Sequence, residues 1–386
     1  MTDYIEIRHA LHEHPQTAGG EQYAHDTIIK HLQGLYPDKV YTHVGGWGII
    51  AVWEGVGRQD IKTSRHQDDG AHGLDVSKSR SLQLPTIAFR ADTDALPIGH
   101  RCGHDGHTTI LLRLAELIDG LTPQLGVRVN ILLLWQPAEE TGTGSQAVIE
   151  SGILQQYNIN AFYGLHNLPG YPLGTVVLSR HTFAAASTGV VYHLDGRETH
   201  ASTPELGINP GLAVSEIVSK FNDFNGQGGT FRQSTLICVK VGQPAFGTSA
   251  GHGEVMFTLR AFTNDTMESL LADANKTVDE IAARHGLTVS RTSVEPFHAT
   301  ENCPDHVKTI EKAAQEMPLE VAYMEQPNRW SEDFAEYLLR WPGAMFGIGS
   351  GEDHAELHHP DYDFPDNLIE PAAQLFFRLA TESRFQ

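Results

Sequence analysis

The segment CGHDGH at residues 102–107 places a thiol, two imidazoles and a carboxylate within six positions. A catalytic cysteine, a metal site and an ordinary polar loop all agree with these residues taken alone. Cys102 as a nucleophile would need a base, and a histidine only two positions away in a turn has poor geometry for that role. The choice therefore depends on residues elsewhere in the chain.

Further metal-binding side chains follow segments whose apolar runs predict strands. They are Glu139 and Glu140 after VRVNILLLW, His166 directly after NAFYGL, and His358 after AMFGIG. Because sites in mainly parallel sheets form beyond the carboxyl ends of the strands, we expect these side chains to meet Cys102 and His104 at one edge of a sheet. A nucleophilic Cys102 would leave most of them without a role.

A thiolate, three imidazoles and a carboxylate suit zinc or another late first-row divalent ion. Five protein ligands are more than one catalytic ion takes, because such an ion keeps a position open for water. Two ions that share a bridging ligand would use all five. The second carboxylate of the PAEE segment would then be a general base, which takes a proton from the attacking water and returns it to the leaving amine.

The elements that must position these residues form two patterns. Up to residue 185, and again from residue 295 to 386, helical and strand periodicity alternate, which predicts a discontinuous α/β catalytic domain with a mainly parallel sheet and helices on both faces. Residues 186–294 read β-α-β-β-α-β, which favours an inserted ferredoxin-like α+β domain. Residues 57–84 are polar and aperiodic, and we interpret them as a surface insertion.

Composition excludes some classes of partner. The 48 acidic and 27 basic residues give a formal charge of -21, which argues against nucleic acid or an anionic membrane surface as partner. The three cysteines are widely spaced and odd in number, so we expect no disulfide framework. No leader pattern follows Met1 and no later run approaches 18 apolar residues, so a cytoplasmic location is predicted.

A series of motifs spans nearly the whole chain. They are LHEHP, FRADTDALPI, RCGHDGHT, QPAEETGTGS, YGLHNLPGYPLGTV, GRETHASTP, SEDFAEYL and LHHPDYDFPDN. In this order the sequence resembles the co-catalytic metallopeptidase and aminoacylase family, in its branch of hippurate hydrolases and indoleacetyl-amino-acid hydrolases. The resemblance implies a homodimer that holds two divalent ions per subunit, zinc or manganese.

The resemblance also implies roles for individual residues. Cys102 bridges the two ions, with His104 and His166 completing one site and Glu140 and His358 the other. Glu139 matches the general base. The family pattern Leu-His-Ser-Pro favours His358 over the adjacent His359 as the ligand.

Residues outside the ligand set have implied roles as well. Asp105 and Asp94 resemble carboxylates that orient ligand imidazoles. The inserted domain resembles a lid and dimerisation domain, in which His200 stabilises the tetrahedral oxyanion in the neighbouring subunit's site and Arg260 lies near the substrate carboxylate. The chain departs from the family at FGTSAGHGEV, residues 246–255, and at a short loop, IGHR, before Cys102.

The sequence therefore predicts a two-metal amidohydrolase that cleaves the amide bond of a small N-acyl amino acid with water. A dipeptidase or carboxypeptidase with the same machinery is the alternative within the enzyme class. A metal-bound binding protein without activity is the alternative outside it, and the intact Glu139 beside Glu140 argues against that alternative.

Overall fold

The computed structural model describes residues 3–56, 84–121, 129–226 and 230–381. All but the last residue of the insertion predicted at 57–84 lies outside the described residues. The chain forms two compact units: unit 1 comprises residues 1–183, 301–326 and 333–386, and unit 2 comprises residues 184–300 and 327–332. Unit 2 thus extends beyond the predicted 186–294 at both ends. It also takes in residues 327–332, because the amide of Ala185 donates to the carbonyls of Asn328 and Trp330.

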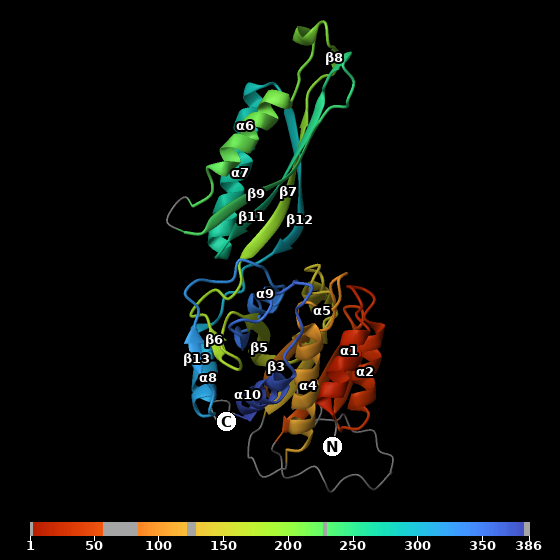
Figure 1. Cartoon of the computed structure of the whole chain (residues 1–386), viewed down its shortest axis with the longest axis vertical. Helices are drawn as coiled ribbons and strands as arrows, with labels where there is room; N and C mark the ends of the chain where they lie inside the picture. Colours follow the sequence, from red (N-terminus) through yellow and green to blue (C-terminus); the bar gives the residue numbers. More distant parts are fainter. Residues whose placement is uncertain (1–2, 57–83, 122–128, 227–229, 382–386) are drawn as a thin grey trace, which may run out of the picture. The chain divides into compact units, whose positions relative to one another are not determined.

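Unit 1 is built on an eight-stranded sheet with the order β1-β2-β4-β3-β5-β14-β6-β13 (Figure 1). Its strands are β1 (Lys39–Val44), β2 (Gly48–Val56), β3 (Pro85–Asp92), β4 (Val129–Gln136), β5 (Asn158–Pro169), β6 (Val176–Leu178), β13 (Val321–Tyr323) and β14 (Gly343–Gly351). The central strands β4, β3, β5 and β14 run parallel to their neighbours in this series. They are buried almost throughout, as parallel strands covered on both faces are.

Helices cover both faces of this sheet. They are α1 (Tyr4–Glu13), α2 (Gln22–Leu32), α4 (His104–Asp119), α5 (Gly144–Glu150), α8 (Pro304–Gln315), α9 (Ala335–Leu338) and α10 (Ile369–Thr381). Successive side chains of a strand point to opposite faces. On β5, Phe162 accordingly packs against Tyr337 of α9, while Tyr163 packs against Phe89, which in turn contacts Phe376 of α10. The predicted α/β class is confirmed.

Unit 2 has a four-stranded antiparallel sheet with the order β12-β7-β11-β9. Its elements are β7 (Ala186–Asp195), β8 (Thr199–His200), α6 (Gly211–Asn222), β9 (Arg232–Val241), β10 (Thr248–Ser249), β11 (His252–Ala261), α7 (Asn264–Arg284) and β12 (Thr288–Phe297). Helices α6 and α7 lie on one face of this sheet (Figure 1), and β8 pairs with β10 in a separate ribbon. Apart from that ribbon, the order of elements is the predicted β-α-β-β-α-β.

None of the helices in the described ranges combines the length and the apolar character that a membrane span requires.

Candidate metal centre

The glycines of CGHDGH let the start of α4 approach other parts of unit 1 closely. Gly103 has a φ of 94°, in the left-handed region that favours glycine, and a side chain there would overlap Asn167 and Tyr362. A side chain at Gly106 would overlap the ring of Phe364. The two glycines between Cys102, His104 and His107 therefore allow this helix to pack closely against β5 and the loop that carries Tyr362 and Phe364.

Gly106→Ala is expected to destabilise the protein. The added methyl group must displace the buried Phe364 ring, and overpacking of this kind lowers the free energy of unfolding by roughly 1–3 kcal/mol. Gly120→Ala is the matched control at the other end of α4, because its methyl group would meet only carbonyl oxygens at 3.5 Å. Urea denaturation followed by circular dichroism would measure both. Equal midpoints for the two variants would contradict the packing role of Gly106.

Cys102 lies at the meeting point of two groups of side chains. Its Sγ is 3.6 Å from Nε2 of His166 and 3.4 Å from Nε2 of His358. One potential ligand atom from each of Cys102, His104 and His166 lies within 4.8 Å of the others, and the same holds for Cys102, Glu140 and His358. The five residues predicted to converge from separate elements are thus together in unit 1.

The structure separates the adjacent histidines 358 and 359. The ring of His358 reaches Cys102, whereas Nδ1 of His359 accepts a hydrogen bond from the amide of Asp361 at 3.1 Å. His358 has a φ of 67°, and its amide donates to the carbonyl of Arg101 at 2.7 Å. Ala138, just before the Glu139–Glu140 pair, has a φ of 55°. Both residues adopt the left-handed conformation that costs a non-glycine residue free energy and that is often found at functional sites.

The donor set fits divalent cations. His104 Nε2 and Glu140 Oε1 lie 3.8 Å apart, and both are buried without a hydrogen-bond partner among the described residues. Burial lowers the pKa of His104 to about 4 and also lowers that of His166, so both imidazoles are neutral and able to coordinate a metal. Burial, followed by the nearby Asp92, raises the pKa of Glu140 to about 7. Cations bound at the two groups would satisfy these buried atoms and stabilise the Glu140 carboxylate.

Asp94 holds the backbone of the paired glutamates in place. Its Oδ1 accepts a hydrogen bond from the amide of Glu139 at 2.9 Å, and its Oδ2 accepts one from the amide of Glu140 at 3.0 Å. The main-chain carbonyl of Asp94, rather than its carboxylate, lies 2.9 Å from Nδ1 of His104. The main chain of Asp94 therefore contacts one imidazole, whereas its carboxylate, which was expected to orient an imidazole, fixes the loop that carries both glutamates.

Asp105 has different partners from those expected. Its Oδ2 lies 2.8 Å from Nδ1 of His12 and 3.3 Å from Nη1 of Arg8, both on α1. Within the described ranges, this carboxylate bonds no imidazole of the Cys102 groups. Its contacts hold α1 against the start of α4.

Three residues beside the centre were not predicted from the sequence. The ring of His107 lies between Asp92 and Asn167, with Nδ1 2.6 Å from Asp92 Oδ1 and Nε2 2.6 Å from Asn167 Oδ1. Burial opposes ionisation of Asp92, but the hydrogen bond from His107 and the charge of Arg90 outweigh it and hold the pKa of Asp92 well below its usual range. The sequence did contain one signal for Asp92: it lies at the end of β3, two positions before Asp94, so both side chains point to the same side of the chain.

The predicted residues His200 and Arg260 belong to unit 2, whereas the Cys102 groups belong to unit 1. His200 is exposed on β8, and its Nδ1 lies 2.6 Å from Oγ of Ser202. Thr248 of β10 pairs with His200, so the unusual segment 246–255 supplies the short strand beside it and then begins β11. Nη1 of Arg260 donates to the carbonyl of Arg329 at 2.8 Å and to Oγ of Ser331 at 3.1 Å.

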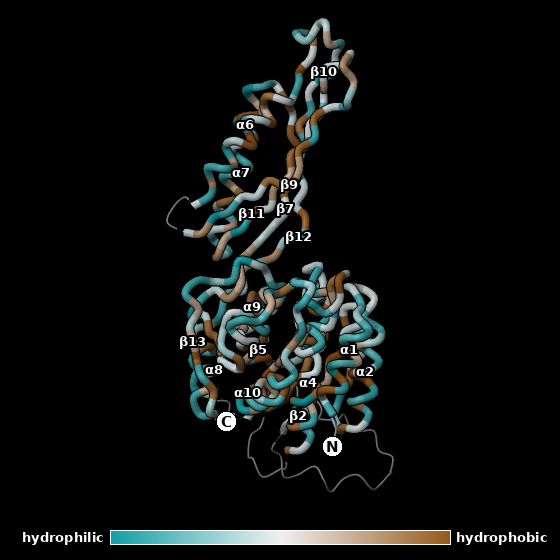
Figure 2. The backbone as a smooth tube through the Cα atoms, in the orientation of Figure 1, coloured by the Kyte–Doolittle hydropathy of each residue, from teal (hydrophilic) through white to brown (hydrophobic). Residues whose placement is uncertain are grey.

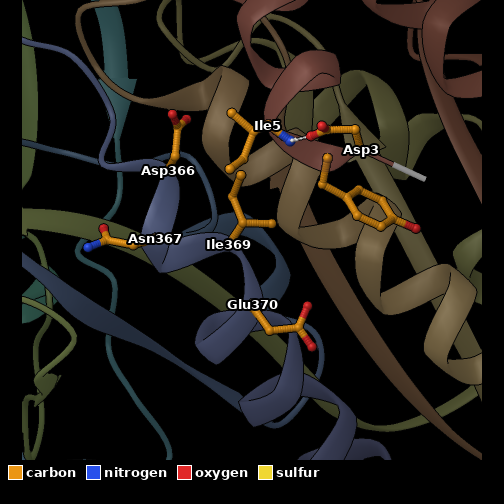
Figure 3. A pocket seen from close by; sticks show the side chains of 7 residues that line it. Asp3, Ile5, Asp366, Asn367, Ile369 and Glu370 are labelled. Atoms are coloured by element: carbon orange, nitrogen blue, oxygen red, sulfur yellow. Dashed lines mark hydrogen bonds between the residues drawn. The ribbon is translucent and has the colours of Figure 1, made fainter. Parts of the chain in front are cut away.

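A pocket of about 420 Å³ lies in a different part of unit 1, where α1 and α10 begin (Figure 3). Asp366 in its wall accepts a hydrogen bond from Arg8, and Glu370 accepts one from Arg113. None of the predicted site residues lines this pocket. Asp366 and Glu370 are thus paired with arginines, so this pocket is a weaker candidate for the functional site than the residues around Cys102.

Two groups of potential metal ligands share Cys102 and lie near the carboxylate of Glu139 on an α/β sheet, an arrangement typical of metallohydrolases. Within that class, the chain belongs to Peptidase family M20/M25/M40, whose model matches residues 88–382. It is a hydrolase that acts on amide bonds.

The relatives agree with this placement. The chain is 30% identical over 318 residues to an N-acetyl-L-cysteine deacetylase of Bacillus subtilis (strain 168), covering 77% of this chain and 74% of that protein. It is 25% identical over 398 residues to an N-acetylcysteine deacetylase of the same strain, covering 98% and 96%. A solved Bacillus subtilis structure, described as a dinuclear metal binding peptidase, shares the fold with a TM-score of 0.79 at 22% identity, covering 98% and 96%.

Proposed function

We propose that this protein hydrolyses the amide bond of N-acyl amino acids with two divalent ions, zinc or manganese, bound at the Cys102 groups. Cys102 would bridge the ions, His104 and His166 would complete one site, and Glu140 and His358 the other. The observation that carries the proposal is the sharing of Cys102 by two groups of potential ligands, each within 4.8 Å. The names of the acetylated-cysteine deacetylases support the class of substrate.

The bound ions would polarise the substrate carbonyl and lower the pKa of the attacking water. Glu139 would act as general base: it takes one proton from that water and later returns it to the departing amine. Two contacts support this role: the Asp94 hydrogen bond holds the Glu139 amide, and Glu139 Oε2 lies 4.0 Å from His104 Nε2. His200 would donate a hydrogen bond to the oxyanion, and Arg260 would bind the carboxylate of the amino acid.

The substrate class can be tested with matched amides. Purified protein would be given N-acetyl amino acids, aromatic acyl amino acids and dipeptides with a free amine, with amine release measured by a fluorogenic assay. We expect the acyl amino acids to give the higher kcat/KM. Preferential cleavage of dipeptides would instead support the dipeptidase or carboxypeptidase alternative, which uses the same centre.

We further propose that the protein is a homodimer joined through unit 2. Strand β9 is an edge of its sheet, and Leu236 and Ile237 on it are 45% and 59% exposed. Figure 2 shows hydrophobic residues along this strand, and Leu212 on α6 is exposed as well. Long apolar edge strands promote association unless they are covered, and a second copy of the same strand would cover this one. Cys102, Cys238 and Cys303 form no disulfide in the part of the chain that the structure describes, which supports a reducing compartment, the cytoplasm, as the location.

Mixing two inactive variants would test whether His200 acts across this interface. His200→Ala and Glu139→Gln dimers would be combined under conditions that exchange subunits. If His200 serves the partner's centre, each mixed dimer has one site with both residues intact, and activity recovers toward about a quarter of wild type because half of the dimers are mixed. Absence of recovery, with exchange verified by mass spectrometry, would reject the action of His200 across the interface.

A further inference from the structure

A second cluster of metal-binding side chains lies on the sheet of unit 2. Strands β7 and β11 are antiparallel, and their register pairs His193 with Glu254 and Asp195 with His252. Because side chains alternate along a strand, all four residues share one face. That face is the one opposite to α6 and α7, since the intervening Leu194 is fully buried in the core beneath those helices.

The side chains of this cluster, His193, Asp195, His252 and Glu254, are oriented toward one another. His193 Nδ1 lies 3.3 Å from Glu254 Oε1, and the two imidazole rings stack with centroids 6.1 Å apart. One potential ligand atom from each of His193, His252 and Glu254 lies within 4.8 Å of the others. His252 Nδ1 lies 2.7 Å from Asp195 Oδ1, so a carboxylate holds one ring nitrogen and orients the other.

The nearby charged side chain, Lys240, does not occupy the carboxylate oxygen of Glu254 that faces the histidines. Lys240 on β9 lies 3.2 Å from Glu254, but it pairs with Oε2, whereas Oε1 faces His193. On the other side, β12 places Ser290 opposite His193 and Thr288 opposite Asp195, and both are neutral. A cation between the histidines would therefore meet two imidazoles and one carboxylate oxygen.

We propose that His193, His252 and Glu254 form a third divalent metal site, separate from the Cys102 centre, for zinc or a related late first-row ion. Two imidazoles and one carboxylate are ligands for ions of this class. Asp195 would position His252 through the hydrogen bond between them. The bound ion would join β7 to β11 across the open face of the sheet. This proposal does not depend on the proposed function, because it uses none of the residues of the catalytic centre.

The test is to count zinc ions at a fixed free concentration. Full-length wild type and the double variant His193→Gln/His252→Gln would be dialysed to equilibrium against zinc-buffered solution, and zinc would be measured by inductively coupled plasma mass spectrometry. We expect the double variant to hold one ion fewer per chain and to keep wild-type hydrolysis. His285→Gln is the matched control, because His285 also lies in unit 2 and pairs with a glutamate, Glu216, outside the cluster.

Glu254→Gln adds an independent arm that preserves the shape of the side chain and replaces only the ligand oxygen. It should also lose one ion per chain, with an unfolding temperature in metal-free buffer close to that of wild type. If the double variant folds poorly, this single substitution decides the matter. Equal zinc content in wild type and Glu254→Gln would overturn the proposal and leave the cluster as a set of cross-strand ion pairs.

Discussion

Glu139→Gln is expected to lower the turnover of an N-acyl amino acid by roughly 10²–10⁴-fold, the range that general acid–base catalysis contributes, while the protein keeps its metal. Glutamine has nearly the same shape as glutamate and can keep the amide hydrogen bond to Asp94, but it can neither accept the proton of the attacking water nor return it to the amine. Steady-state kinetics and metal analysis on the same sample would measure both effects.

Glu140→Gln is the matched comparison, because the two residues are adjacent and Asp94 holds both amides. As a ligand in the group of Cys102 and His358, Glu140 should be needed for metal binding, so its variant should lose metal content together with activity. If Glu139→Gln loses metal while Glu140→Gln retains it, the two roles are reversed. Full activity in both variants would refute the assignment altogether.

The second large effect concerns Cys102. Cys102→Ala removes the atom that belongs to both ligand groups, so we expect loss of both catalytic ions and of all metal-dependent hydrolysis. Cys102→Asp keeps an anionic ligand at the shared position, because carboxylates also bind zinc. This variant should retain measurable metal and more activity than the alanine variant.

A different outcome would revive the cysteine nucleophile. In that case Cys102→Asp would be as inactive as Cys102→Ala, and mass spectrometry during turnover would detect an acyl thioester on wild-type Cys102. The structure favours the ligand role, since two imidazoles from distant segments, His166 and His358, both lie within hydrogen-bond range of the sulfur. A nucleophile would require only one base.

The convergence of the potential metal ligands could be predicted from the sequence because of simple strand geometry. Apolar runs marked β4, β5 and β14, and the carboxyl ends of parallel strands meet at one edge. His166 shows the limit of that reasoning. The sequence placed His166 just after a strand, but it lies within β5, which continues to Pro169. The strand end was predicted too early because polar residues at the end of a buried strand resemble the start of a loop.

Contacts between distant segments could not be predicted in this way. Arg90 is fully buried and bonds Asp92, Gln136 and Asp333, so the SEDF segment supplies a counter-ion to β3 from 243 positions away. The left-handed backbone at Ala138 and His358 also has no local sequence signal, because it is imposed by tertiary hydrogen bonds. Periodicity identifies elements, whereas these features depend on how the elements pack.

The central claim is that amide hydrolysis depends on metal bound at the Cys102 groups. The most direct test is to remove metal with a chelator, verify its removal by elemental analysis, and measure hydrolysis of an N-acyl amino acid as zinc or manganese is added back. The account predicts no hydrolysis in the metal-free protein and recovery on addition of the ion in wild type, with no recovery in Cys102→Ala. Full hydrolysis by metal-free wild-type protein would contradict it.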